Sequence, residues 1–478
     1  MPGADRYSKL MSNTLLFALS NFSSKLLNLC LTPFLTFALQ ETSVLGVTKL
    51  TQQCANLLIP VVGLGMSFSV IRFGLDKNQN KSQVFTNGLV TILCGFGLMV
   101  LAYPLLSMIP LVSDYALLLY VYVLVSCLRT LCTQFIRSRQ LNRLVALDGV
   151  LTTFTLLGFN ILFLVVFKWG AAGYLLATIC SDFGSAVFVF ITGKLWNYLD
   201  RRSFNQRLWK EMLRYSLPMI PAQISFWVIN ASDMFFVASM CQGYQGQSGT
   251  HWTGLLSTGY YLPTIVSTLG GIFYEAWQLS AITEEEDRSA FFSRIFKVYQ
   301  GVMFCCGAGI IWLCRPAMFI FRENFYEAWQ FVPFLTIASI FTCFNQFFNT
   351  IYMVYKRSGY SLFTMLSGAV VNCILNFVLI WTMGPVGAAL ASALSMGLVF
   401  VLRVISTQSL IPVDYGSASL GLDLILLTAE AVVLLLDLPG TFWITGAITL
   451  AIILLNLKEV WSMAELILGK LFKRRKAS

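Results

Sequence analysis

Polar and charged side chains recur at helical spacing inside segments of the chain that are otherwise apolar. In the segment 15–39, Asn21, Lys25 and Asn28 follow one another at intervals of four and three residues. This interval places side chains on one face of a helix. Polar groups within a membrane are costly and usually face a bundle interior or a water-filled cavity. The spacing therefore predicts a polar path lined by helices.

Two basic residues, Lys25 and Arg129, lie deepest within such segments. Each is about 15 Å along its predicted helix, at about 1.5 Å per residue. A cation at that depth faces water, a carboxylate or an anionic ligand. We predict an anionic ligand, with an ion pair to Asp182 or Asp233 as the alternative. For Arg72, near the end of its segment, the alternative is that the side chain reaches the lipid headgroups.

Amide, hydroxyl and aromatic side chains form further stripes in the other apolar segments. The members that we predict to line the path, besides Asn21 and Asn28, are Asn56, Gln223, Asn230, Tyr261, Thr264, Asn345 and Asn349. The alternative is that such side chains form structural hydrogen bonds between helices. The spacing alone fits both interpretations.

Three carboxylates lie in these segments, namely Asp182, Asp233 and Glu275. They suit either the binding of a coupling cation or proton, or plain ion pairing. Asp233 lies about 27 Å along its predicted helix, nearer the outer end than the centre. For this residue we expect a gate, or a contact between the two halves of the protein.

The sequence shows no pattern for catalysis or for a resident metal. It has no Ser/His/Asp set, metal-ligand spacing or glycine-rich phosphate loop, and His251 is the only histidine. The 12 cysteines form no C-x-x-C motif, so no disulfide framework is indicated. We expect a protein that is not an enzyme and that has no cofactor, apart from a possible coupling cation such as H⁺ or Na⁺.

The elements that position these side chains are predicted to be membrane helices. The chain has 478 residues, of which 57% are hydrophobic and 11% charged, whereas soluble domains have about 25% charged residues. Its net charge of +10 fits basic residues gathered in cytoplasmic loops, and nothing indicates nucleic-acid binding. The composition therefore indicates an all-α polytopic membrane protein.

Fourteen apolar segments are long enough to be candidate spans. They cover residues 15–39, 48–72, 84–109, 115–136, 147–167, 171–193, 215–240, 253–276, 295–320, 329–354, 360–382, 385–407, 418–437 and 441–457. With the N-terminus in the cytoplasm, this count places most lysines and arginines on the cytoplasmic side. We therefore predict that both termini lie in the cytoplasm.

An internal repeat relates the two halves of the chain. WGAAGYLLATICS at 169–181 aligns with MGPVGAALASALS at 383–395, and an even number of spans separates them, so the repeat is parallel. We predict a six-helix lobe at 1–200, a second at 201–407 and two additional helices at 408–457. The tail 458–478 is basic and amphipathic, which suggests an interfacial helix. The alternative is that its basic residues only keep the end of the last membrane helix on the cytoplasmic side.

Several stretches together resemble a known family. They are SNTLLFALSNFSSKLLNLCLTPFLT at 12–36, LLIPVVGLGMSFSVIRFGLD at 57–76, EMLRYSLPMIPAQISFWVINASD at 211–233, IFYEAWQLSAI at 272–282 and GPVGAALASALS at 384–395. In order and topology they are similar to bacterial polysaccharide exporters of the O-antigen and capsule flippase type, within the multidrug/oligosaccharidyl-lipid/polysaccharide superfamily. One departure is Met234, where relatives often have arginine after the aspartate.

This resemblance implies two lobes of six helices that move a lipid-linked oligosaccharide from the inner to the outer leaflet of the bacterial cytoplasmic membrane. An anionic substrate of the polyprenyl pyrophosphate type would place its phosphates at Lys25, Arg129 and Arg72, and its sugars near the amide and aromatic residues. The lobes would rock around the cavity, with Pro33, Pro218, Pro221 and Pro263 as candidate kinks.

The sequence also leads to expectations about the oligomeric state and about a competing function. We expect a monomer surrounded by membrane lipids. The competing function within the same fold is a multidrug exporter, which would favour buried carboxylates over buried cations.

Overall fold

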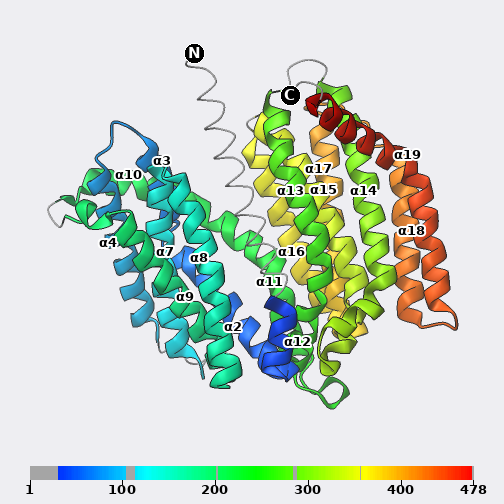
Figure 1. Cartoon of the computed structure of the whole chain (residues 1–478), viewed down its shortest axis with the longest axis horizontal. Coiled ribbons are helices and arrows are strands. Elements are labelled where there is room, and N and C mark those ends of the chain that lie inside the picture. Colours follow the sequence, from blue (N-terminus) through cyan, green and yellow to red (C-terminus); the bar gives the residue numbers. More distant parts are fainter. Residues whose placement is uncertain (1–30, 104–113, 201–202, 284–287, 356, 476–478) are drawn as a thin grey trace. The chain divides into compact units, whose positions relative to one another are not determined.

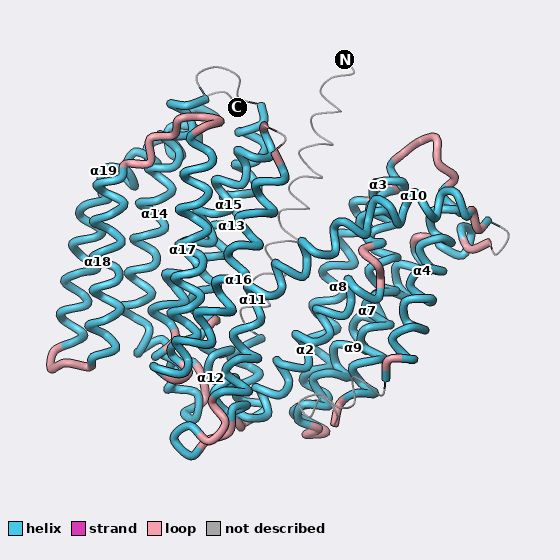
Figure 2. Tube along the Cα trace, turned by 180° about the vertical axis from the view of Figure 1, so that it is seen from behind, coloured by secondary structure: helices cyan, strands magenta, loops and turns pink. Residues whose placement is uncertain are grey.

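The computed structural model describes residues 31–103, 114–200, 203–283, 288–355 and 357–475 (Figure 1). Within these ranges every regular element is a helix, as Figure 2 shows. The chain divides into two compact units, residues 1–227 and residues 228–478. The all-α class predicted from the sequence is therefore confirmed.

The first unit is a bundle of long helices with one short amphipathic helix. Its elements are α2 (Thr42–Val62), α3 (Met66–Leu75), α4 (Lys81–Leu101), α7 (Ala116–Ser138), α8 (Asn142–Asn160), the π-helical turn η1 (Ile161–Val166), α9 (Gly170–Thr192) and α10 (Gln206–Ser216). The 3₁₀ turns η2 (Leu195–Tyr198) and η4 (Leu217–Met219) flank α10. In this bundle α7 packs against α2, α3 and α9, and α9 packs against α8.

A break separates α2 from α3 and bends this pair by 49°. Pro60 lies inside the last turn of α2, where its ring removes a backbone donor and disturbs the helix. Gly65 precedes α3 with φ +61°, a left-handed conformation that glycine adopts without steric cost. A Cβ atom at Gly65 would also lie 3.0 Å from the backbone oxygen of Ser216. The break was not among the predicted kinks.

The short helix α10 lies almost entirely between the predicted spans at 171–193 and 215–240. The Asn205 side chain accepts hydrogen bonds from the backbone N–H groups of Arg207 and Leu208, which caps the helix. Its inner face is fixed by Trp209, whose Nε1 donates to Thr91 Oγ1 at 2.8 Å, and by Ser69, whose hydroxyl donates to the Met212 oxygen. This stretch therefore closes one end of the first unit.

The second unit contains the remaining helices. They are α11 (Ile220–Met240), which begins in the first unit, α12 (Gly249–Gly259), α13 (Tyr261–Thr283), α14 (Arg288–Ala317), α15 (Val332–Val354), α16 (Ser358–Met383), α17 (Val386–Gln408), α18 (Ser417–Leu436) and α19 (Thr441–Arg475). The turns η5 (Tyr244–Gly246), η6 (Met318–Ile320) and η7 (Glu323–Gln330) are 3₁₀.

Helices α18 and α19 form a hairpin at the edge of the second unit, where both pack against α14 (Figures 1 and 2). The turn between them spans residues 437–440 and ends at Gly440, with φ +79°. The core of this unit is aromatic: the Phe296 ring lies 5.1 Å from Phe347 and 5.0 Å from Phe348, centroid to centroid. These three side chains are fully buried.

The predicted count of fourteen spans is not confirmed. In the described part of the chain, ten helices are long and apolar enough to cross a membrane, or up to eleven if α2 and α3 form one bent span. Most of the predicted span at 15–39 lies outside the described residues. Helix α11 is not among these helices. Its apolar run is interrupted by Gln223, Asn230 and Asp233. The chain is nevertheless a multi-pass membrane protein.

The two units share a pattern of helix neighbours. In the first, α9 packs against α7 and α8; in the second, α17 packs against α15 and α16. These are the pairs that the predicted parallel repeat equates. The predicted lobe limits at 200 and 407 stay predictions, and the contact division instead falls within α11, at Trp227.

Candidate functional site

The first unit contains a buried charged cluster centred on Arg129 of α7. Its Nη1 lies 2.9 Å from Asp182 Oδ1 on α9, with side-chain exposures of 30% and 9%. Arg129 Nε donates to Ser185 Oγ at 2.9 Å, and the Ser126 hydroxyl donates to Asp182 Oδ2 at 2.5 Å. Of the two interpretations of Arg129, the ion pair with Asp182 is the one present in this structure.

A second carboxylate, Asp148 of α8, joins this cluster. Ser185 Oγ donates to Asp148 Oδ1 at 2.6 Å, so the serine links Asp148 to Arg129. Both Asp148 and Asp182 are buried, and the contacts just described give them a single cation, Arg129. Arrangements with one excess buried negative charge suit proton or cation binding.

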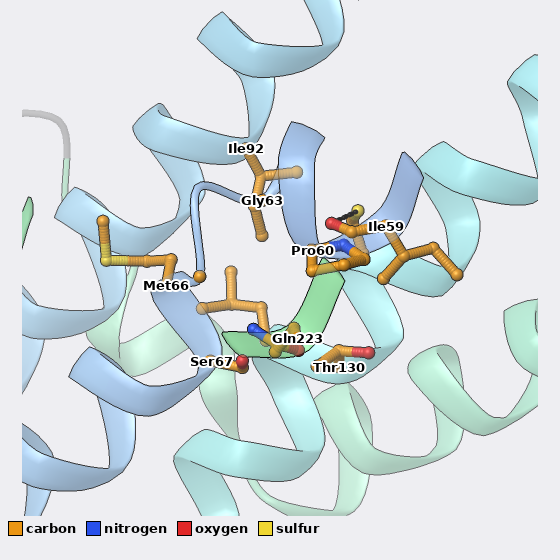
Figure 3. Close-up of a pocket in the computed structure, with 11 residues that line it drawn as sticks. Ile59, Pro60, Gly63, Met66, Ser67, Ile92, Thr130 and Gln223 are labelled. Carbon is orange, nitrogen blue, oxygen red and sulfur yellow. Dashed lines mark hydrogen bonds between the residues drawn. The ribbon is translucent and has the colours of Figure 1, made fainter. Parts of the chain in front are cut away.

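A small cavity lies at the break between α2 and α3. Its volume is about 130 Å³, and Figure 3 shows Gln223 at its centre, between Pro60, Ser67 and Thr130. The Gln223 Nε2 atom is buried and has no hydrogen-bond partner among the described residues. Most of the remaining wall is apolar, including Ile92. An unsatisfied amide donor in an apolar cavity is suited to an acceptor group on a ligand.

The second unit contains a neutral hydrogen-bond network around Asp233 of α11. Asn376 Nδ2 donates to Asp233 Oδ1 at 2.6 Å, and the Tyr260 hydroxyl donates to Oδ2 at 2.9 Å. The Ser392 hydroxyl also donates to Oδ2. Asn372 extends the network, since its Oδ1 accepts from Asn376 at 3.0 Å. Asp233 is fully buried, and every contact named here comes from a neutral group.

A buried arginine, Arg403 of α17, occupies another part of the second unit. It is 3% exposed, and its Nε donates to Thr364 Oγ1 at 3.2 Å. Its Nη1 donates to the backbone oxygen of Asn345, while the Asn345 Nδ2 donates to the Met396 oxygen at 3.0 Å. The Asn345 amide thus forms a hydrogen bond between α15 and α17. Such bonds between helices were the alternative interpretation of the polar residues in the sequence.

The other predicted residues with described side chains lie apart from these clusters. Asn349 accepts from Ser361 Oγ at 2.5 Å, Asn56 donates to Gln53 Oε1 at 3.2 Å, and Thr264 donates to the Tyr260 oxygen at 2.7 Å. The Tyr261 ring packs edge-on against Phe321, with centroids 5.1 Å apart. Arg72 and Asn230 are exposed.

Four predicted residues have no side chain that the structure describes. Asn21, Lys25 and Asn28 lie outside the described residues. Glu275 lies within α13, but its side chain is not among those described. Their assignments to a phosphate site, a sugar site and a coupling site remain predictions.

Several residues of these clusters were missed in the sequence. Asn372 and Asn376 lie four residues apart and so form a polar stripe of the kind sought elsewhere. Asp148 is close to the start of α8 and resembles an ordinary interfacial residue in the sequence. Only the packing of α8 against α7 and α9 brings it to Ser185 and so to Arg129.

Two solved structures have a fold similar to that of this chain. It is similar to the solved structure of lipid II flippase MurJ in an inward closed conformation, with a TM-score of 0.69, 15% identity, and coverage of 96% of this chain and 100% of that one. It is also similar to a multidrug resistance MATE family transporter of the MOP superfamily in inward-facing form, with a TM-score of 0.64, 14% identity and coverage of 81% and 95%. This chain therefore has a fold similar to those of these two transporters.

The amino-acid sequence identifies the protein family. Residues 10–277 match the family model of polysaccharide biosynthesis proteins, and this chain belongs to that family. A comparison with curated protein sequences gives no match.

Proposed function

We propose that this protein is a transporter that moves a lipid-linked oligosaccharide from the inner to the outer leaflet of the bacterial cytoplasmic membrane. Membership of the polysaccharide biosynthesis family is the observation that carries this proposal. The fold similarity to a lipid II flippase supports it, as do buried polar clusters in both helical units. Transport follows from alternating access, with both termini in the cytoplasm.

The substrate class is an anionic lipid-linked saccharide, such as a polyprenyl pyrophosphate sugar. Its phosphates bind Lys25, Arg129 and Arg72. Because Arg129 is paired with Asp182 at 2.9 Å, a phosphate binds there in exchange for that carboxylate. Charge-assisted and bidentate hydrogen bonds make a guanidinium well suited to phosphate.

The sugars bind the amide, hydroxyl and aromatic side chains, while the apolar tail stays in lipid. Gln223 is the best supported of these contacts, since its Nε2 has no partner and lies in the cavity at the α2–α3 break. Asn21, Asn28, Asn56, Asn230, Tyr261, Thr264, Asn345 and Asn349 complete this set. The Asn345 Nδ2 also donates to the Met396 oxygen.

Coupling to an ion gradient is assigned to the buried carboxylates. Asp233 accepts hydrogen bonds from Tyr260, Asn376 and Ser392, which are neutral groups. A buried carboxylate with neutral neighbours is stabilised by taking up a proton or a monovalent cation. Asp182 and Glu275 are the other candidates, and Asp182 is already compensated by Arg129.

Export of cationic drugs is the second candidate function. The fold similarity to a multidrug resistance MATE family transporter favours it, together with the buried Asp148 and Asp233. The two functions predict different phenotypes. Deletion of the gene should remove a surface glycan under the first proposal and should sensitise cells to cationic drugs under the second.

The decisive experiment is a flipping assay in proteoliposomes. Purified protein is reconstituted with a fluorescent polyprenyl-pyrophosphate oligosaccharide, and the outer-leaflet fraction is measured with a membrane-impermeant quencher. Lys25→Ala and Arg129→Ala should each reduce flipping at least tenfold, whereas Arg207→Ala should not, because Arg207 is exposed and only pairs with Glu211. If Lys25→Ala and Arg129→Ala both flipped the substrate at the wild-type rate, the assignment of these two residues to the phosphate site would be excluded.

A further inference from the structure

Helix α18 carries two acidic residues on one face, and a third lies at its C-cap. Asp423, Glu430 and Asp437 follow one another at intervals of seven residues, which is close to two turns of an α-helix. Asp423 and Glu430 are buried within the hairpin of α18 and α19 and its contact with α14. Acidic residues on a membrane helix face usually have a partner of opposite charge.

Cations compensate the two acids that flank α18, Asp414 before it and Asp437 after it. Arg315 Nη1 of α14 lies 2.7 Å from Asp437 Oδ1, and Arg315 Nη2 donates to the Leu434 oxygen. Lys297 Nζ, at the other end of α14, lies 2.5 Å from Asp414 Oδ2. Both cations that α14 provides here are therefore bound to the outer acids.

Glu430 lies between these ends and has only a neutral contact. Its side chain is fully buried, and Oε1 accepts from Thr449 Oγ1 of α19 at 2.8 Å. The other oxygen, Oε2, is buried and has no hydrogen-bond partner in the part of the chain that the structure describes. Asp423 is about 10 Å away along the helix axis, at about 1.5 Å per residue, so the two acids do not share one ion. Its Oδ1 accepts from Asn456 Nδ2 at 2.9 Å.

Among the described side chains, the other titratable groups on the helices packed against α18 are Arg288, Arg294, Tyr299, Cys305, Cys306 and Cys314 on α14, Cys343 and Tyr352 on α15, and Lys458 on α19. Arg288 and Arg294 lie further toward the start of α14 than Lys297, and cysteine and tyrosine carry no positive charge. Tyr352 is bonded to Ser406, Cys343 contacts the Val266 oxygen, and Lys458 is exposed. Among the described groups, an ionised carboxylate at Glu430 would therefore lack a cation, which is costly in an apolar seam.

We propose that Glu430 is a proton-binding site in the seam between α14, α18 and α19, separate from the Asp233 network and independent of the substrate. The folded protein holds Glu430 as a neutral carboxylic acid. Loss of this proton places a charge in the seam and weakens the packing of the α18–α19 hairpin on α14. The hairpin is thereby a proton-responsive element.

The test compares wild-type protein with Glu430→Gln, an uncharged replacement of the same shape. Denaturant unfolding is followed in detergent from pH 5 to pH 9. Because the folded wild type binds one proton more than the unfolded chain, it loses stability as pH rises above the usual glutamate range near ~4.3. The ratio of the two unfolding constants should therefore shift in favour of Glu430→Gln by up to about tenfold per pH unit.

Asp437→Asn is the matched control, seven residues further along the chain at the C-cap of α18. Asp437 is paired with Arg315, so its loss should lower stability at neutral pH and should confer no advantage that grows with pH. Equal pH dependence of wild type and Glu430→Gln would overturn the proposal. Stabilisation of the wild type by Na⁺ or K⁺ that is lost in Glu430→Gln would also overturn it, in favour of a metal cation.

A chemical measurement keeps the proposal testable if Glu430→Gln does not fold. Dicyclohexylcarbodiimide reacts with protonated carboxyl groups in apolar surroundings to give a stable N-acylurea. Mass spectrometry of treated wild-type protein should find this adduct on Glu430, less at pH 9 than at pH 6, and not on Asp437. An unmodified Glu430 in protein that carries the adduct on other intramembrane carboxyls would count against the site.

Discussion

Asp233 is held by groups that can donate hydrogen bonds without neutralising its charge. Tyr260, Asn376 and Ser392 all contact its carboxylate. Such a site distinguishes the charged from the uncharged state of one residue, which is what ion coupling needs. The function of Asp233 should therefore depend on its ionisable carboxyl rather than on its shape.

Replacing Asp233 by Asn tests this role. The amide preserves the size of the side chain but cannot bind a proton or a cation, so flipping driven by an ion gradient should fall at least tenfold. The measurement is substrate flipping in proteoliposomes with and without an imposed H⁺ or Na⁺ gradient. Ser232→Ala is a suitable control, because Ser232 bonds to Asn372 rather than to the carboxylate. Unchanged gradient-driven flipping in Asp233→Asn would refute the assignment.

The Arg129–Asp182 pair allows a second prediction for single residues. Removal of one partner leaves a buried charge, so Asp182→Asn and Arg129→Met should each destabilise the protein by up to about 3 kcal/mol. Contacting partners couple, so the double variant should recover about 0.5–3 kcal/mol relative to the sum of the single effects. Thermal unfolding of solubilised protein measures all three. Strict additivity would mean that the pair does not stabilise the fold.

Sequence reasoning reached part of this chemistry. Arg129 and Asp182 were both recognised as intramembrane charges, and their pairing was one of two interpretations, because a buried cation needs an anion. Asp148, Asn376 and Ser392 were not recognised. Each of these three residues lies on a different helix from the charged residue of its cluster. The spacing of residues along one helix gives no information on which helices pack together.

At the scale of the element, the break between α2 and α3 depends on glycine. Gly65 has φ +61° and lies against the Ser216 oxygen, so Gly65→Ala should cost about 1–2 kcal/mol and should distort the cavity around Gln223. The unfolding midpoint and the flipping rate should both fall. Gly97→Ala in α4 is the control, since a Cβ there meets nothing within 4 Å. Equal effects of the two changes would show that the left-handed conformation is not needed.

Hydropathy located the long helices well. The predicted segments 329–354, 385–407 and 418–437 correspond to α15 (Val332–Val354), α17 (Val386–Gln408) and α18 (Ser417–Leu436). It failed for α10, because a short amphipathic helix has too few apolar residues, and it did not anticipate the α2–α3 break. Both depend on local capping and backbone conformation.

At the scale of the whole molecule, the distribution of basic residues predicts the orientation. Both termini should be cytoplasmic, while the turn between α18 and α19 should face the opposite side. Single cysteines placed at Ser478 and at Pro439 in a variant without native cysteines should differ in intact cells. Only the cysteine at 439 should react with a membrane-impermeant maleimide. Labelling at 478 would reverse the proposed orientation.

The turn between α18 and α19 also offers a practical handle. It spans residues 437–440 at the edge of the second unit, Leu438 is 47% exposed, and a Cβ at Gly440 would meet open space. The two helices on either side are held against α14, so a folded domain inserted after Pro439 would be anchored by two rigid arms. For a 53.4 kDa membrane protein, such an insertion provides the asymmetric landmark that single-particle image alignment requires.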